Sequence, residues 1–214
     1  MKQIRLDKLL LEKKLVKNID EASSLINEKK IRIPNFNSKL LFEHTLVNID
    51  SNIKILDKKF VSRGGEKLDR FIADTNLIID QKICLDVGAS TGGFTDALLK
   101  RGANKVYCID VGKSELNYKI RNDKRVEFFE NINAKYSFDL GFSKLDIIAV
   151  DVSFISVTKI IPQLINFLST KSVLIVLIKP QFEAKKNQID KGGILTNNFL
   201  VPEIIDNVIK TIEK

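Results

Sequence analysis

A glycine-rich segment follows a short apolar run, at the place where a ligand-binding loop would lie. It extends from Asp86 to Phe94 and contains three glycines. Glycine lets the backbone turn sharply and approach a ligand closely before a helix begins, here predicted over 94–101. Asp110 stands 22 residues beyond Gly88, at the end of the next apolar run, where a carboxylate can accept both hydroxyls of a ribose. The spacing therefore predicts a site for a nucleotide-like ligand.

The charges around this loop favour one cofactor over another. A dinucleotide would use the same loop, but a carboxylate at Asp86 would repel a pyrophosphate and suits the cationic amino-acid end of S-adenosylmethionine (SAM). Ser90, in place of a middle glycine, favours SAM as well. The alternatives are a tight turn without a ligand and, for Asp110, a helix N-cap. The predicted cofactor-binding residues are Asp86, Gly88, Ala89, Ser90, Gly92, Gly93, Phe94, Asp110 and Asn131.

One acidic and two basic side chains stand where further elements end. Asp151 directly follows the apolar run 145–150, and Lys179 directly follows the run 173–178. Lys67 lies before the run 83–87, which is the first of the apolar runs in this part of the chain. A neutral lysine can remove a proton from a weakly acidic hydroxyl, provided that its pKa falls below the free value of about 10.4. Methyl transfer from SAM to a ribose 2′-hydroxyl needs such a base. The alternative is a surface ion pair between Asp151 and a nearby lysine.

The elements that must position these residues are five apolar runs alternating with helical patterns. We predict strands over 83–87, 105–109, 126–129, 145–150 and 173–178. This order is typical of an α/β protein with a parallel, doubly wound, Rossmann-like sheet. Ligands of such sheets bind at the carboxyl ends of the strands, where the candidate residues stand.

The first sixty residues follow a different pattern. Leu6, Leu9 and Leu10 have helical spacing, a second helix is predicted from Asn18 with Glu21 at capping-box spacing, and strands are predicted over 31–33 and 45–49. The chain carries a net charge of +8, and basic residues are concentrated at its start. This charge favours a polyanionic partner; the alternative is lysine used as a solubilising surface residue. The order of the elements resembles the small α+β RNA-binding domain first described in a ribosomal small-subunit protein, and the alternative is an α+β cap that only packs on the next domain. The predicted RNA-binding residues are Arg5, Lys8, Lys13, Lys14 and Arg63.

These patterns divide the chain into residues 1–60 as a small RNA-binding domain, 61–81 as a linker and leading helix, and 82–214 as a methyltransferase domain. Cys84 and Cys108 lie in apolar runs and are expected to be buried and reduced. Neither a zinc motif nor a run long enough to span a bilayer is found, so we expect no metal site, no membrane segment and a cytoplasmic protein.

Five motifs occur in order along the chain, at residues 62–68, 86–96, 151–156, 179–183 and 191–193. Through these motifs the chain resembles the TlyA family, the haemolysin-A-like ribosomal RNA 2′-O-ribose methyltransferases, from about residue 4 to 205. The resemblance implies an N-terminal RNA-binding domain, an FtsJ-like methyltransferase domain, SAM as cofactor, ribosomal RNA or ribosomal subunits as partners, and cytidine methylation.

The family's catalytic set of Lys, Asp, Lys and Glu maps onto Lys67, Asp151 and Lys179. The final glutamate belongs to a late strand that has no counterpart before Lys214, and Glu183 is too close to Lys179 in sequence to replace it. Two edge strands are also expected to be missing. An active enzyme is therefore the leading hypothesis, and a catalytically weak ribosome-assembly factor that retains SAM binding is the alternative. A membrane-lytic protein, which the haemolysin name suggests, is disfavoured because no segment is apolar enough to insert.

Overall fold

The computed structural model describes residues 2–34, 36, 40–56, 59–113, 115–141 and 144–213. The chain divides into two compact units, Met1–Lys59 and Phe60–Lys214. Residues 61–81, predicted as a linker and leading helix, lie inside the second unit. Among the described helices, none combines the length and the apolar character needed to cross a membrane.

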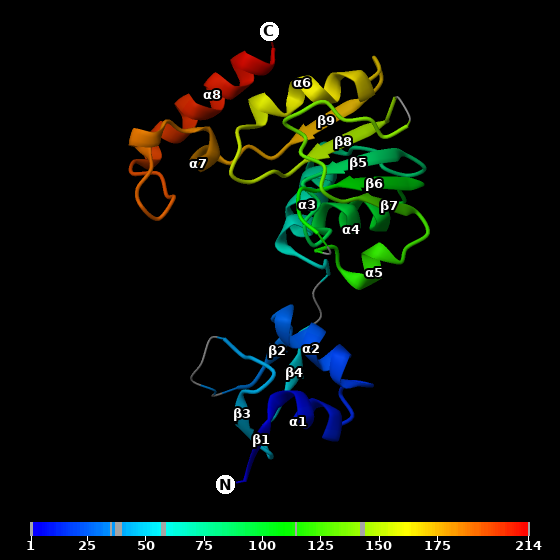
Figure 1. Ribbon diagram of the computed structural model, residues 1–214, viewed down its shortest axis with the longest axis vertical. Helices are drawn as coiled ribbons and strands as arrows, with labels where there is room; N and C mark the ends of the chain where they lie inside the picture. The colour runs from blue at the N-terminus through cyan, green and yellow to red at the C-terminus, as the bar shows by residue number, and fades with distance from the viewer. Residues whose placement is uncertain are drawn as a thin grey trace. The chain divides into compact units, whose positions relative to one another are not determined.

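The described residues of the first unit form two helices and four very short strands (Figure 1). β1 pairs with β3 and β2 pairs with β4, both antiparallel, and the three leucines of α1 that were predicted to be buried are at most 1% exposed. Asn18 caps α2 by accepting the N–H of Glu21 at 2.8 Å, which confirms the predicted helix start. The elements are β1 (Gln3–Arg5), α1 (Leu6–Glu12), α2 (Ile19–Asn27), β2 (Ile31–Arg32), β3 (Leu46–Asn48) and β4 (Lys54–Ile55).

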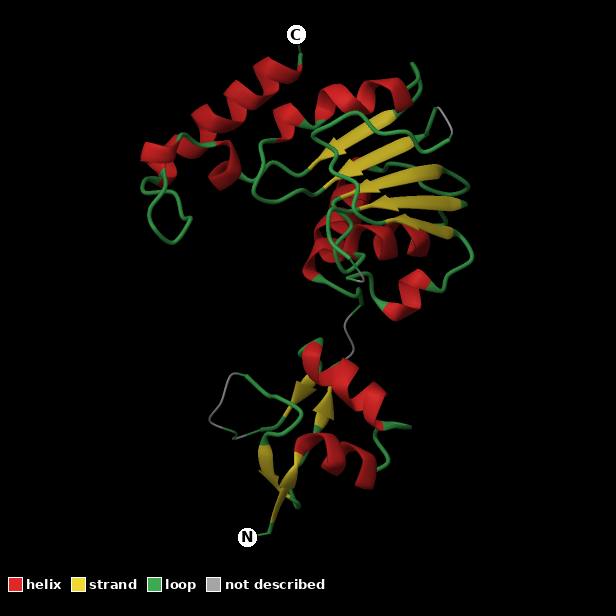
Figure 2. Ribbon diagram, in the orientation of Figure 1, coloured by secondary structure: helices red, strands yellow, loops and turns green. Residues whose placement is uncertain are grey.

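The second unit contains a five-stranded parallel sheet with the order β7-β6-β5-β8-β9, which confirms the predicted fold class (Figure 2). Chain order reverses between β5 and β8, so these two central strands form the topological switch point. Ligands of doubly wound sheets bind beside this point. The strands are β5 (Ile83–Val87), β6 (Lys105–Ile109), β7 (Val126–Phe129), β8 (Ile147–Val150) and β9 (Val173–Val176).

Each face of this sheet has its own apolar core. In one core, α3 and α4 pack against Cys84, Cys108 and Ala149 of the sheet. In the other, α6 and the segment 134–140 pack against the strand side chains on the opposite face. Both cysteines are free and fully buried, as predicted. The helices are α3 (Arg63–Thr75), α4 (Gly93–Lys100), α5 (Tyr118–Arg121), α6 (Ile161–Leu164), α7 (Pro180–Glu183) and α8 (Val201–Ile212).

The start of α3 packs against the start of α4 through two glycines. A Cβ atom on Gly65 would lie 2.6 Å from the Phe60 Cβ and 2.8 Å from the Gly93 carbonyl oxygen, and one on Gly93 would collide with the Ser62 Oγ. Carbon atoms do not approach so closely without displacing their neighbours. This contact fixes the helix that carries Lys67 relative to the helix that follows the glycine-rich loop.

We expect the Gly65→Ala substitution to lower the free energy of unfolding by about 2 kcal/mol, the usual cost of overpacking. Chemical denaturation followed by circular dichroism measures it. Gly64→Ala is the matched control, because a Cβ on Gly64 meets its nearest atoms at an ordinary 3.4 Å and alanine favours the helix. If both variants were equally stable, the close packing would not explain Gly65.

Candidate active site

The glycine-rich loop between β5 and α4 touches the segment that follows β8. Gly88 has a φ of 85°, and a Cβ there would lie 2.8 Å from the carbonyl oxygen of Asp151. The Asp151 N–H donates to the carbonyl of Val87 at 3.0 Å. Only glycine combines this backbone conformation with such a close approach. The two strand ends at the switch point are thereby joined.

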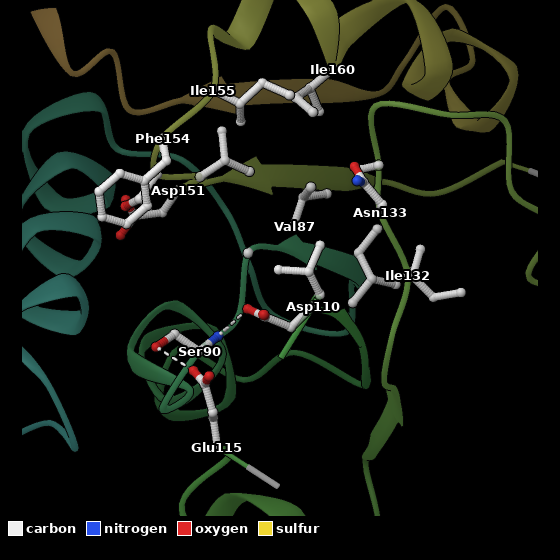
Figure 3. Close-up of a pocket in the computed structure, with 16 residues that line it drawn as sticks. Val87, Ser90, Asp110, Glu115, Ile132, Asn133, Asp151, Phe154, Ile155 and Ile160 are labelled. Atoms are coloured by element: carbon white, nitrogen blue, oxygen red, sulfur yellow. Dashed lines mark hydrogen bonds between the residues drawn. The ribbon is translucent and has the colours of Figure 1, made fainter. Parts of the chain in front are cut away.

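A cavity of about 330 Å³ opens beside this junction, and we call it the acidic cavity. Asp110, Glu115 and Asp151 line it, whereas none of its described lining residues is a lysine or an arginine. Figure 3 shows aliphatic side chains, among them Ile155 and Ile160, on the side away from Asp110 and Glu115. The cavity thus combines an apolar wall with a negative potential.

Asp110 holds the glycine-rich loop as well as lining the cavity. One of its oxygens accepts the Ser90 N–H and the other accepts the Gly112 N–H, each at 2.7 Å. The Ser90 hydroxyl donates to Glu115 at 3.4 Å (Figure 3). Each carboxylate oxygen of Asp110 has a second lone pair. Asp110 could therefore accept hydrogen bonds from the hydroxyls of a ribose and keep its bonds to Ser90 and Gly112. Glu115 was not identified from the sequence, because it lies in a loop without a motif.

Asp86 does not reach the cavity, which corrects its predicted contact with the cofactor. Its side chain is fully buried on the opposite side of β5, where one carboxylate oxygen accepts the N–H of Thr95 at 2.9 Å and its hydroxyl at 2.6 Å. Thr95 is the third residue of α4, so Asp86 caps this helix. The pKa of Asp86 is raised to about 7, chiefly by burial; the hydrogen bonds from Thr95 lower it, and the nearby charges of Asp151 and Asp110 raise it. Asp86 therefore stabilises the start of α4, the helix that follows the glycine-rich loop, from the side of β5 opposite the cavity.

Other predicted cofactor residues also lie elsewhere. Asn131 is exposed, with a φ of 59°, and Asn133 lines the acidic cavity in its place. Gly92 lines neither cavity of this site; a Cβ on it would lie 2.8 Å from Leu116, so it is required for packing. Gly88 and Ser90 line both the acidic cavity and its neighbour, while Ala89, Gly93 and Phe94 line the neighbour alone.

That neighbour is a cavity of about 400 Å³, which we call the basic cavity. Arg63, Lys67 and Lys179 line it, and Asp151 is the one carboxylate among its described lining residues. Arg63 and Lys67 are the first and fifth residues of α3, a spacing that places them on one helix face. The structure therefore brings together the three residues predicted to be catalytic, with Asp151 shared between the two cavities.

Asp151 and Lys179 form the ion pair at this junction. The Lys179 Nζ lies 2.6 Å from Asp151 Oδ1 and donates to the Ser153 Oγ at 2.8 Å. Both charged side chains are about one-fifth exposed. Glu183 is directed elsewhere, where it accepts the Ser156 hydroxyl and the Val157 N–H. It does not complete the catalytic set.

Phe154 is a functional candidate that the sequence analysis did not single out. Its side chain is 92% exposed, its φ is 64°, and its ring lies 5.1 Å from the ring of Phe182. A bulky residue seldom adopts a left-handed conformation, and such strain persists where a site requires it. Figure 3 shows the Phe154 ring beside Asp151 at the edge of the acidic cavity. The Asp-Val-Ser-Phe motif contains the residue, but only the backbone reveals its conformation.

The basic residues of the first unit differ in their surroundings. Arg5 donates to Asp7 through two nitrogens, at 3.1 and 2.6 Å, and this pairing lowers the pKa of Asp7. Lys8, Lys13 and Lys14 are exposed on and just after α1. Of the predicted RNA-binding residues in this unit, the three lysines are thus the more accessible to a phosphate.

Comparisons with known proteins identify the family of the chain. The model of the FtsJ-like methyltransferase family matches residues 60–214. Hemolysin A of Brachyspira hyodysenteriae is 44% identical over 174 residues, which cover 79% of this chain and 71% of the relative. The 16S/23S rRNA (cytidine-2′-O)-methyltransferase TlyA of Mycobacterium tuberculosis is 33% identical over 198 residues, covering 91% and 73%.

A solved structure shows the same likeness. It is described as a hemolysin from Streptococcus thermophilus, and it matches with a TM-score of 0.71 and 31% identity over 99% of this chain and 78% of its own. The family match covers the unit that contains both cavities. The chain belongs to the FtsJ-like methyltransferase family of SAM-dependent enzymes, together with the relatives named hemolysin A and TlyA.

Proposed function

We propose that this enzyme transfers a methyl group from SAM to the 2′-hydroxyl of a cytidine in ribosomal RNA. The observation that carries the proposal is the pair of adjoining cavities with opposite charge, which share Asp151. A cationic methyl donor fits one cavity and a polyanionic acceptor fits the other. The methyl group would cross where they meet.

The acidic cavity fits SAM in charge and in shape. SAM carries an ammonium, a sulfonium and a carboxylate, so a lining with three acidic residues and no described basic residue favours its net positive charge. Asp110 and Glu115 would hold its polar groups, while Ile132 and Ile160 offer an apolar surface to the adenine. When bound, SAM supplies an electrophilic methyl group.

The basic cavity supplies the groups that a ribose hydroxyl needs in order to react. Arg63 and Lys67 would bind phosphates of the RNA backbone. Lys179, held by Asp151, would accept the hydroxyl proton as the oxygen attacks. Holding the two reactants in line removes much of the entropic barrier. The mechanism needs only positioned side chains and one proton acceptor.

The substrate assignment rests on the relatives. TlyA of M. tuberculosis is named for cytidine 2′-O-methylation of 16S and 23S rRNA, and it covers 91% of this chain. The exposed lysines of the first unit add a surface suited to RNA. We therefore propose that the first unit binds ribosomal RNA, either free or within a subunit, and that the second modifies it.

The direct test incubates the protein with tritiated SAM and unmodified ribosomal subunits, and then identifies the labelled nucleoside. We expect 2′-O-methylcytidine, with transfer about a thousandfold slower in the Lys179→Ala variant. Transfer no greater than that of the variant, with SAM still bound, would instead favour the ribosome-assembly factor. The observation that favours this second candidate is the single carboxylate among the described residues of the basic cavity.

The triple substitution of Lys8, Lys13 and Lys14 by alanine should weaken RNA binding and leave SAM binding unchanged. Each lost phosphate contact reduces the salt dependence, so the slope of log K against log[salt] should fall by roughly 2 to 3. Filter binding at several salt concentrations measures it. The matched control replaces three exposed lysines of the second unit, Lys159, Lys171 and Lys210. Equal slopes for both triple variants would argue against the first unit as the RNA-binding part.

Phe154→Ala should lower kcat/KM for the RNA about tenfold, while Phe154→Tyr should retain activity. Stacking of a base on an aromatic ring contributes roughly 1–3 kcal/mol, and the exposed Phe154 ring lies beside Asp151. Steady-state kinetics with ribosomal subunits measures the effect. Phe199→Ala is the control, since that ring is 93% exposed but lines neither cavity. If Phe154→Ala and Phe199→Ala were alike, stacking by Phe154 would be ruled out.

A further inference from the structure

We propose that Ser153 is a positioning residue that directs the amine of Lys179 toward the hydroxyl to be methylated. The inference rests on the proposed function, because it assigns Lys179 the role of proton acceptor. Ser153 lines both the acidic and the basic cavity. It therefore stands where donor and acceptor would meet.

The contacts of the Lys179 nitrogen carry the argument. Its Nζ lies 2.6 Å from Asp151 Oδ1 and 2.8 Å from the Ser153 Oγ. An amine nitrogen is tetrahedral, and one of its four directions is the bond to its own side chain. The Ser153 hydroxyl accepts one N–H bond and so fixes a second direction. Asp151 Oδ1 lies within ion-pair distance but accepts no hydrogen bond from the described residues, so it contributes charge and not a fixed direction. In the neutral amine, the second N–H bond and the lone pair share the two remaining directions.

Asp151 alone would not fix this orientation. Without the Ser153 hydroxyl, the amine could rotate about its last carbon–nitrogen bond and direct its lone pair elsewhere. The centroid of the Phe182 ring lies 5.9 Å from the Nζ. The Ser153 hydroxyl is the hydrogen-bond acceptor that restricts this rotation.

The backbone around Ser153 is consistent with a constrained role. Ser153 lies between Asp151, whose N–H is bonded to Val87, and Phe154, whose φ is 64°. A left-handed bulky residue costs of order 1–3 kcal/mol and is retained when its surroundings determine it. This turn presents the Asp151 carboxylate and the Ser153 hydroxyl to the same nitrogen.

The proton balance follows from the geometry. The ribose oxygen forms a bond to the methyl carbon as the methyl–sulfur bond breaks, and the hydroxyl proton moves to the Nζ of Lys179. The resulting ammonium has three N–H bonds, of which one is directed at Ser153 and one at the new ether oxygen, while Asp151 stabilises its charge. No further reactant is needed. Release of this proton to solvent restores the neutral amine.

The decisive comparison is between Ser153→Thr, which keeps the hydroxyl, and Ser153→Val, which has the same shape without it. We expect the valine variant to lose about tenfold in kcat with KM for SAM and RNA within twofold, and the threonine variant to stay within threefold of the wild type. Ser169→Ala, at an exposed serine before β9, is the control.

A second measurement needs no RNA. Lys179 in the intact protein is acetylated with acetic anhydride over a range of pH, and its labelling rate is read by mass spectrometry. We expect labelling at least threefold faster in Ser153→Val than in the wild type, and unchanged in Ser153→Thr. Equal labelling and equal kcat in the two variants would overturn the proposal. If the wild type transferred no methyl group to RNA, the proposed function would fail. The acetylation rate of Lys179 would still test its hydrogen bond to Ser153.

Discussion

The Lys179→Ala variant should methylate ribosomal RNA about a thousandfold more slowly than the wild type. A positioned acid or base contributes roughly 10²–10⁴ to a rate, and Lys179 is the side chain that Asp151 and Ser153 both hold. Binding of SAM should change less than threefold, because Lys179 does not line the acidic cavity. Single-turnover transfer of a tritiated methyl group measures the rate, and calorimetry measures the affinity.

Lys171→Ala is the matched control, since it removes an exposed lysine from the opposite end of β9. It should keep the wild-type rate. A loss of less than tenfold in Lys179→Ala would remove this residue from the role of proton acceptor. A large loss of SAM affinity in the same variant would show that the two cavities do not bind their ligands separately.

The second large effect concerns Asp86 and pH. Its pKa is raised from 3.8 to about 7, mainly by burial, so between these values the folded protein keeps a proton that the unfolded chain releases. The stabilising contribution of this proton is fully present below pH 4 and is lost as pH rises toward 7. Each pKa unit corresponds to about 1.36 kcal/mol, so the loss amounts to roughly 4 kcal/mol at most.

The Asp86→Asn variant should not show this loss, because an amide does not titrate in the range and still offers an oxygen to Thr95. Relative to the wild type, it should become more stable as pH rises from 4 to 8. Denaturation in urea at several pH values, without SAM, measures the difference. Asp206→Asn, at an exposed aspartate of α8, is the control. A constant difference between wild type and Asp86→Asn across pH would contradict the raised pKa.

The sheet was predictable because its central strands β5 and β8 are largely buried on both faces, and because all five strands are mostly apolar in sequence. Three of the five strands have the predicted bounds, whereas β8 and β9 are shorter. The reason is pairing: β8 and β9 are in register only from Ile147 and Val173 to Val150 and Val176. A strand ends where its pairing with the neighbouring strand ends. The apolar run of one strand does not show where that pairing stops.

The strand ends that contribute to the candidate site were predictable from the sequence. The direction in which each side chain points from its strand was not. Neighbouring residues of a strand point to opposite faces, so Asp86 and Val87 could not both reach one cavity. The residue that reaches the cavity is the one on the face that α4 does not cover. Because α4 packs on the Asp86 side, Val87 lines the cavity. The left-handed backbone of Phe154 and the bond from Lys179 to Ser153 likewise depend on tertiary structure.

The two cavities that meet at Asp151 also determine what kind of inhibitor would suit this enzyme. A molecule that filled both would have to be dipolar, with a cationic end toward Asp110 and Glu115 and an anionic end toward Arg63 and Lys67. Reversing its two ends would set like charges against each other in both halves of the site. Selectivity would then come from the order of charges along the molecule, not from its size.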